Sequence, residues 1–131
     1  MLYRIQTLYL LISIFIYSII IYFSFNLIID FFYFNLKKTI QLFIITCLFL
    51  STLSFFLFKK KKLQIFLNKI NILVNIIHGL KLTLFFSCGQ LNQTTLILLL
   101  ITFCTCILLC ISANIAIKKD IELISSINRI R

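Results

Sequence analysis

Three long uncharged segments dominate the hydropathy pattern of the chain. Residues 8–29 and 40–58 carry no charge, and residues 96–117 lie within an uncharged stretch that begins after Lys81. A transmembrane helix needs about 20 mostly apolar residues to cross about 30 Å of hydrocarbon. The pattern therefore predicts transmembrane helices over these three segments.

A fourth apolar segment, residues 70–86, contains polar side chains and is a weaker candidate. Asn71, Asn75 and His78 raise the cost of inserting it into a bilayer, and Lys81 adds a charge. Lys81 lies near the end of the segment, where a lysine side chain can reach the membrane surface. Because three strongly apolar neighbours accompany this segment, we expect it to form a fourth span, with a helix at the interface as the alternative.

The positions of the basic residues predict the orientation of these spans. With four spans, one side of the membrane holds ten of the 13 Lys and Arg residues, and the other side holds Lys37, Lys38 and Lys81. Basic residues concentrate in cytoplasmic loops. We therefore expect a multi-pass protein of the bacterial inner (plasma) membrane with both termini in the cytoplasm. The ten residues are Arg4, Lys59, Lys60, Lys61, Lys62, Lys69, Lys118, Lys119, Arg129 and Arg131.

Short connections between the spans predict an all-α fold. Neighbouring helices must then be antiparallel, so we expect a four-helix bundle of two hairpins within a single domain, residues 1–131. After the last span, residues 118–131 keep a helical period, with isoleucines opposite charged side chains. This pattern predicts an amphipathic tail helix that lies along the anionic inner leaflet. A docking surface for a cytoplasmic partner is the alternative interpretation.

Composition and charge exclude a soluble domain. The chain is 62% hydrophobic and 12% charged, which leaves too few polar side chains to cover a core in water. The net charge of +10 would suggest nucleic acid in a soluble protein. Here the charges lie between and after the spans, so we expect no nucleic-acid partner. The expected partners are the lipid bilayer, anionic lipid head groups, and a membrane protein complex or a second copy of the chain.

Polar residues of the third span form the clearest candidate site. At 100° per residue they fall within an arc of about 80°, so they share one helix face. We name this face the polar stripe; it consists of Gln64, Asn68, Asn71, Asn75 and His78. Such a stripe must face protein or water in a bilayer. The stripe is interpreted either as a set of hydrogen bonds that stabilise the packing of the helices or as part of a proton or cation path.

The remaining candidate chemistry is sparse. The single histidine and the five cysteines show no zinc-binding spacing, and the three carboxylates, Asp30, Asp120 and Glu122, do not identify an acid/base pair. We therefore expect no catalytic residues, no metal site and no cofactor, and we expect that the chain is not an enzyme. The second candidate surface is a cytoplasmic basic face formed by Lys59, Lys60, Lys61, Lys62, Lys118, Lys119, Arg129 and Arg131.

Three stretches of the chain resemble one known family. They are Arg4–Leu11, Lys62–Leu73 and, most specifically, the terminal pattern Ala-Asn-x-Ala-Ile-Lys-Lys-Asp-x-Glu-Leu-Ile-x-Ser-x-x-Arg-Ile-Arg that begins at Ala113. Over nearly its whole length the chain resembles the domain of unknown function 4293 family of small four-span membrane proteins from Bacteroidetes. The resemblance implies an uncharacterised inner-membrane protein with four helices. The family usually has an acidic residue where this chain has Asn128.

These observations favour a non-enzymatic structural or complex-associated membrane subunit. In this hypothesis, the basic face and the tail helix contact anionic lipid or a partner complex. The alternative is a small transporter, or a component of a proton or cation path, that uses the polar stripe of the third span.

Overall fold

The computed structural model describes residues 2–27, 34–87 and 93–130. Within these ranges the regular elements are four α-helices: α1 (Leu2–Leu27), α2 (Phe34–Phe56), α3 (Lys61–Ser87) and α4 (Gln93–Ile130). Each is long and apolar enough, by length and composition, to cross a membrane. The fold class is therefore all-helical, and residues 70–86 lie inside a helix of this kind.

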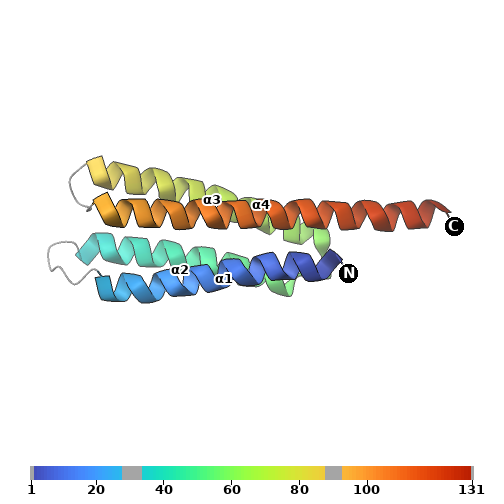
Figure 1. Cartoon of the computed structure of the whole chain (residues 1–131), viewed down its shortest axis with the longest axis horizontal. Coiled ribbons are helices and arrows are strands. Elements are labelled where there is room, and N and C mark those ends of the chain that lie inside the picture. Colours follow the sequence, from blue (N-terminus) through green and yellow to red (C-terminus); the bar gives the residue numbers. More distant parts are fainter. Residues whose placement is uncertain (1, 28–33, 88–92, 131) are drawn as a thin grey trace.

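Two helices extend well beyond the predicted spans. α3 begins at Lys61 and α4 continues without a break to Ile130. Neither extension contains glycine or proline, so nothing in the local sequence ends the hydrogen-bonded helix there. The prediction of a separate tail helix after residue 117 is corrected: residues 118–130 are the last turns of α4. Its straight course does not support a helix that lies along the membrane (Figure 1).

The four helices run alternately up and down and form a closed ring (Figure 1). α1 packs against α2 and α4, and α3 likewise packs against both α2 and α4. The predicted division of the bundle into two hairpins is not supported, because the contacts between the pairs α1–α2 and α3–α4 are as extensive as those within them. The start of α1, the turn between α2 and α3, and the end of α4 lie at the same end of the bundle (Figure 1). We name this the basic end.

Buried positions recur along each helix in alternating steps of three and four residues. This spacing is typical of helices that pack with a slight left-handed twist around a shared core. The positions with this spacing are 6, 10, 13, 17 and 20 in α1; 40, 44, 47, 51 and 54 in α2; 64, 68, 71, 75, 78 and 82 in α3; and 103, 106, 110, 113 and 117 in α4. Leu96, Asn114 and Ala116 of α4 are buried as well. Every helix therefore presents one continuous face to the centre of the bundle.

The bundle has many polar side chains in its interior and an apolar surface. The buried faces include glutamine, asparagine and serine side chains, whereas large apolar side chains such as Phe15, Phe49 and Leu108 are more than 60% exposed. A soluble protein of this size rarely exposes so much contiguous apolar surface. The arrangement suits a hydrocarbon environment, in which polar groups must find their partners inside the protein.

Candidate functional site

The polar stripe of α3 lies at the centre of the bundle. Gln64, Asn68, Asn71 and Asn75 are fully buried, and His78 is 4% exposed. The stripe faces polar or small side chains on the other helices: Gln6, Ser13 and Tyr17 of α1; Cys47, Ser51 and Ser54 of α2; and Cys106, Cys110, Ala113 and Asn114 of α4. The amides thus meet groups that can hydrogen-bond with them across helix interfaces.

Asn75 is the most connected residue of this interior. Its Nδ2 lies 2.8 Å from the Tyr17 Oη, and its Oδ1 accepts a hydrogen bond of 3.0 Å from the same hydroxyl group. The Cys47 thiol lies 3.8 Å from Oδ1. Within α3, Nδ2 also lies 2.8 Å from the Asn71 backbone oxygen and 3.2 Å from its Oδ1. One amide therefore joins α1, α2 and α3.

The two preceding asparagines of the stripe connect α3 to α4. Asn71 Nδ2 donates to the Cys110 sulfur at 3.7 Å, and Asn68 Nδ2 donates to Asn114 Oδ1 at 2.9 Å. Since Asn75 reaches α1 and α2, the three asparagines together contact every other helix of the bundle. Such hydrogen bonds between membrane helices contribute about 0.6 kcal/mol each.

These contacts also define the level of each residue along the bundle axis. α1 and α3 are parallel, and the Tyr17–Asn75 pair sets an offset of 58 residues between them. The same offset places Gln6 at the level of Gln64. α2 and α3 are antiparallel, and the contact between Cys47 and Asn75 then places Ser54 opposite Asn68. The polar groups therefore form successive layers along the bundle.

Several atoms of the interior lack a partner within the described part of the chain. Both side-chain atoms of Gln64 are buried without a hydrogen bond, and so are Asn68 Oδ1 and Ser54 Oγ, near the basic end. Further along α3, both ring nitrogens of His78 are also unpaired. The stripe is therefore well bonded at Asn71 and Asn75, half bonded at Asn68, and without side-chain hydrogen bonds at Gln64 and His78 within the described residues.

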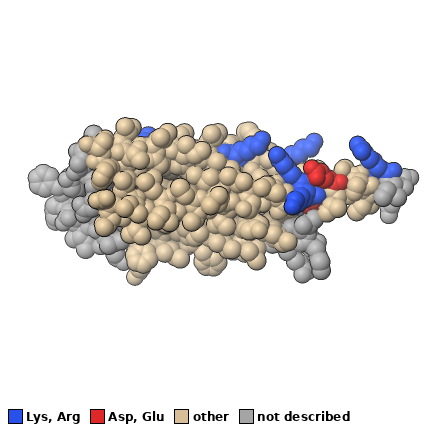
Figure 2. All heavy atoms as spheres, turned by 45° about the horizontal axis from the view of Figure 1, so that its top comes forward, with Lys and Arg blue, Asp and Glu red and all other residues tan. Residues whose placement is uncertain are grey.

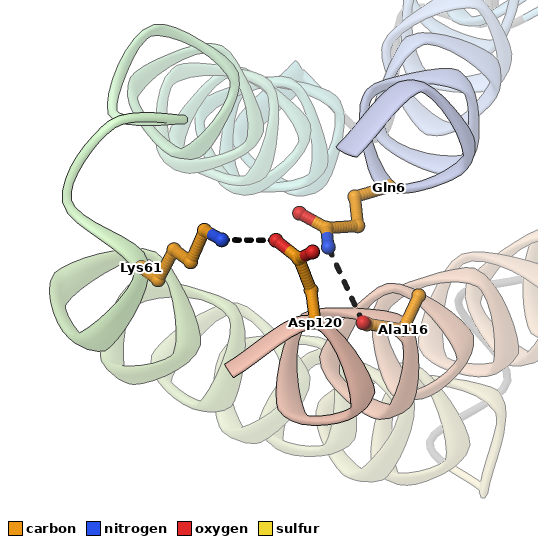
Figure 3. A network of polar contacts seen from close by, with 4 residues as sticks. All are labelled: Gln6, Lys61, Ala116 and Asp120. Atoms are coloured by element: carbon orange, nitrogen blue, oxygen red, sulfur yellow. Dashed lines mark hydrogen bonds and ion pairs between the residues drawn. The ribbon is translucent and has the colours of Figure 1, made fainter. Parts of the chain in front are cut away.

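The basic end is closed by two polar contacts (Figure 3). Lys61, the first residue of α3, forms an ion pair with Asp120 of α4. One turn deeper, Gln6 Nε2 donates a hydrogen bond of 3.2 Å to the Ala116 backbone oxygen. Together these contacts join α3 and α1 to the same part of α4.

The ion pair brings most of the predicted basic face together. It sets Lys61 and its neighbours beside Lys118 and Lys119, which precede Asp120 in α4. Lys59, Lys60, Lys62, Lys118 and Lys119 are exposed, and Figure 2 shows basic side chains gathered toward this end. Arg129 lies farther along α4, and Arg131 is outside the described residues.

Sequence reasoning missed part of this interior. It identified the polar stripe of α3, which is buried. It did not find the buried face of α2 or the partners of the stripe in α4. The signal was present in α2, where Cys47, Ser51 and Ser54 are spaced by four and three residues. Two residues that were missed in α4, Cys110 and Asn114, bond to the stripe.

The arrangement offers hydrogen-bonding contacts between helices. Around the centre of the stripe, asparagine amides pair with the Tyr17 hydroxyl, the Cys110 thiol and the Asn114 amide, and the cysteines of the described residues form no disulfide. No cluster of three or more histidine, cysteine or carboxylate side chains that could hold a metal occurs in the ranges that the structure describes. What the interior can do is align four helices in one register.

The fold and the buried polar side chains together define a class of protein. Its members are small proteins with four helices that are long and apolar enough to span a membrane, packed around a core that contains polar side chains. The chain belongs to the family described as Domain of unknown function (DUF4293), whose sequence profile matches residues 2–130. No curated protein and no solved structure matches the chain significantly.

Proposed function

We propose that the chain is a non-enzymatic subunit of a protein complex in the bacterial inner membrane. In this proposal the four helices anchor the subunit, and the last part of α4 docks a partner. The observation that carries the proposal is the end of α4, which projects beyond the bundle (Figure 1). We name residues 121–130 the extension.

The length of the extension follows from the contacts at the basic end. Lys61 is the first residue of α3 and pairs with Asp120, so α3 begins at the level of Asp120 in α4. Gln6 contacts Ala116, which places the start of α1 close to the same level. Ten residues of helix at about 1.5 Å each then extend about 15 Å past the other helices.

The extension has an apolar half without a cover. Leu123, Ile124 and Ile127 are 46–57% exposed and lie within an arc of about 100°. The opposite side of the helix carries Glu122, Ser125, Ser126 and Arg129. An amphipathic helix that ends in water buries its apolar face against a partner, and a second helix with a matching face fits this shape. The proposed partner is therefore a helix of another subunit.

The proposed orientation places the extension in the cytoplasm. Support comes from the basic residues, which the fold gathers at the end that holds both termini and the turn between α2 and α3 (Figures 1 and 2). An end of a membrane protein that holds most of its Lys and Arg residues favours the cytoplasmic side. The lysines of this end are also suited to contact anionic lipid head groups around the docked partner.

Site-specific photocrosslinking in intact cells tests the docking proposal. A photoreactive amino acid at Ile127 should form an abundant crosslink to one membrane protein, because this side chain is 57% exposed on the apolar half. The same amino acid at Ser126, on the polar half of the same turn, should crosslink far less. Mass spectrometry of the product should locate the crosslink in an apolar helix of the partner.

Two outcomes would contradict this proposal. One is equal crosslinking from both positions, which would indicate random collisions rather than a docked face. The other is a complex whose composition, in mild detergent, is unchanged by the double substitution Leu123→Gln and Ile127→Gln. The matched control is Ser125→Gln with Ser126→Gln, which alters the polar half of the extension to a similar size.

A second candidate function is a component of a proton or cation path. The observation that favours it is the set of unpaired polar atoms at both ends of the buried stripe, on Gln64, Asn68 and His78. Polar groups inside membrane segments often mark such paths. Against it stands the bonded centre of the stripe, where Tyr17 and Asn75 close the core.

Reconstituted proteoliposomes distinguish the two candidates. If the stripe conducts, proton or sodium flux should exceed that of empty vesicles and should fall when His78→Ala or Asn75→Leu is introduced. If the docking proposal is correct, the wild-type protein should show no flux above the empty vesicles. Flux that is present but insensitive to both substitutions would remove the stripe from consideration as a path.

A further inference from the structure

A pocket lies near the end of the bundle opposite the basic end. Its lining comes from the start of α2, the last third of α3 and the first part of α4. The lining residues are Ile40, Phe43, His78, Lys81, Leu82 and Phe103. Four of these six side chains are apolar, and the other two can donate hydrogen bonds.

His78 is the residue of this pocket that most needs a partner. It is 4% exposed, and neither ring nitrogen has a hydrogen bond within the described residues. Its ring lies 3.7 Å from the Phe43 ring and 6.2 Å from the Phe103 ring, measured between centroids. A buried imidazole N–H without an acceptor is costly, and the surrounding phenylalanines offer none. An acceptor supplied by a ligand removes this cost.

Lys81 adds a positive charge to the same pocket. It follows His78 by about one helical turn, and its ammonium lies 4.6 Å from the centroid of the Phe43 ring. The pocket lining contains no carboxylate. Among the described residues, the carboxylates belong to Asp120 and Glu122 at the other end of the bundle, about 25 Å away along its axis. Two donors and one positive charge select an anionic, acceptor-rich group.

The depth of the pocket in the membrane indicates which molecule supplies the anionic, acceptor-rich group. Lys61 and Lys81 are 20 residues apart in α3, which corresponds to about 30 Å, the thickness of the hydrocarbon core. With Lys61 at one boundary of the membrane, Lys81 lies at the other. His78 then lies about 4.5 Å deeper. In a lipid leaflet, ester carbonyls lie at this edge of the hydrocarbon core, and phosphates lie just outside it, where a lysine side chain can reach them.

The pocket has a volume of about 10 Å³, which admits one small acceptor group. We propose that a membrane phospholipid binds at the mouth of this pocket, with its phosphate on the exposed Lys81 and one ester carbonyl oxygen in the pocket, on His78. The apolar side chains of Ile40, Leu82 and Phe103 are buried and surround the space that this carbonyl enters. Free phosphate is also negatively charged, but it has no ester carbonyl that could reach His78 below the edge of the hydrocarbon core. This binding site is independent of the docking function proposed for the extension, which lies at the other end of the molecule.

The single histidine makes a direct test possible. Protein labelled with ¹⁵N-histidine has imidazole signals from His78 alone, because the chain contains one histidine. Phosphatidylglycerol, added to the protein in maltoside micelles, should shift these signals in a saturable manner. Inorganic phosphate at the same concentration should not. A shift caused by inorganic phosphate would overturn the lipid assignment in favour of a free-anion site.

Two lysine variants complete the test. Lys81→Gln should weaken the apparent affinity for phosphatidylglycerol about tenfold or more, because it removes a charge-assisted hydrogen bond to the phosphate. Lys69→Gln removes an exposed charge from another face of the same helix and should leave the affinity unchanged. Lys81 is exposed, so its substitution should leave the fold intact. The proposal fails if the lipid causes no shift, or if both variants weaken it equally.

Discussion

Asn75→Leu should destabilise the bundle by about 2 kcal/mol. The substitution removes the hydrogen bonds between α1 and α3 and leaves the fully buried Tyr17 hydroxyl without its partner. An orphaned buried hydroxyl costs about 1–3 kcal/mol, to which the lost bonds between membrane helices add about 0.6 kcal/mol each. Unfolding of the purified protein in mixed micelles, titrated with SDS, measures the change.

Gln64→Leu is the matched control for this prediction. It makes a similar change from amide to leucine on the same face of α3, at a side chain that is also fully buried. Gln64 has no side-chain hydrogen bond among the described residues, so its loss orphans no other group. We expect stability to stay the same or to rise. A loss as large as that of Asn75→Leu would show that burial alone, and not the bonding of Asn75, decides the effect.

A double-mutant cycle isolates the pair itself. In Tyr17→Phe, the asparagine loses a partner, and in the double variant neither polar group of the pair remains. The cost of Asn75→Leu should therefore be smaller in the Tyr17→Phe background than in the wild type. Equal costs in the two backgrounds would contradict direct coupling between these side chains.

Ala113→Leu should also destabilise the bundle by about 2 kcal/mol, but through packing. Ala113 is fully buried in α4, one turn from Ala116, whose backbone oxygen accepts the bond from Gln6 of α1. Small residues at such positions let membrane helices approach closely, and overpacking a dense core costs about 1–3 kcal/mol. The same SDS titration measures this loss.

Ser112→Leu provides the comparison for the packing prediction. Ser112 is the neighbouring residue in α4, it is only partly buried, and its hydroxyl donates to the Leu108 backbone oxygen within the helix. Added bulk there is directed away from the centre of the bundle, so stability should change little. If Ser112→Leu costs as much as Ala113→Leu, close approach at Ala113 is not the cause.

Helix content could be predicted well from the pattern of residues. Long apolar segments must satisfy their backbone groups internally, and a helix does so without any partner. The limits of the helices were less predictable. α4 passes from an apolar segment into a charged one without a break, and the change of composition at Lys118 suggested a boundary that the backbone does not have.

The polar stripe shows where sequence reasoning reached its limit. A period of 3.6 residues is enough to assign Asn68, Asn71 and Asn75 to one face of α3, since that depends on local geometry alone. It does not reveal that Asn75 meets Tyr17, 58 residues away, while the Gln64 side chain finds no hydrogen-bond partner among the described residues. Those outcomes depend on the register between helices, and each register depends on all four helices at once.

The sequence by itself determined the helical class, the polar face of α3 and the separation of basic residues from the spans, because each is a property of composition or of one helix. The tertiary structure decided three things. It selected the partners within the core, it paired Lys61 with Asp120, and it carried α4 past the bundle as an uncovered extension. These depend on how far one helix slides along another, which residue spacing within a single helix does not encode.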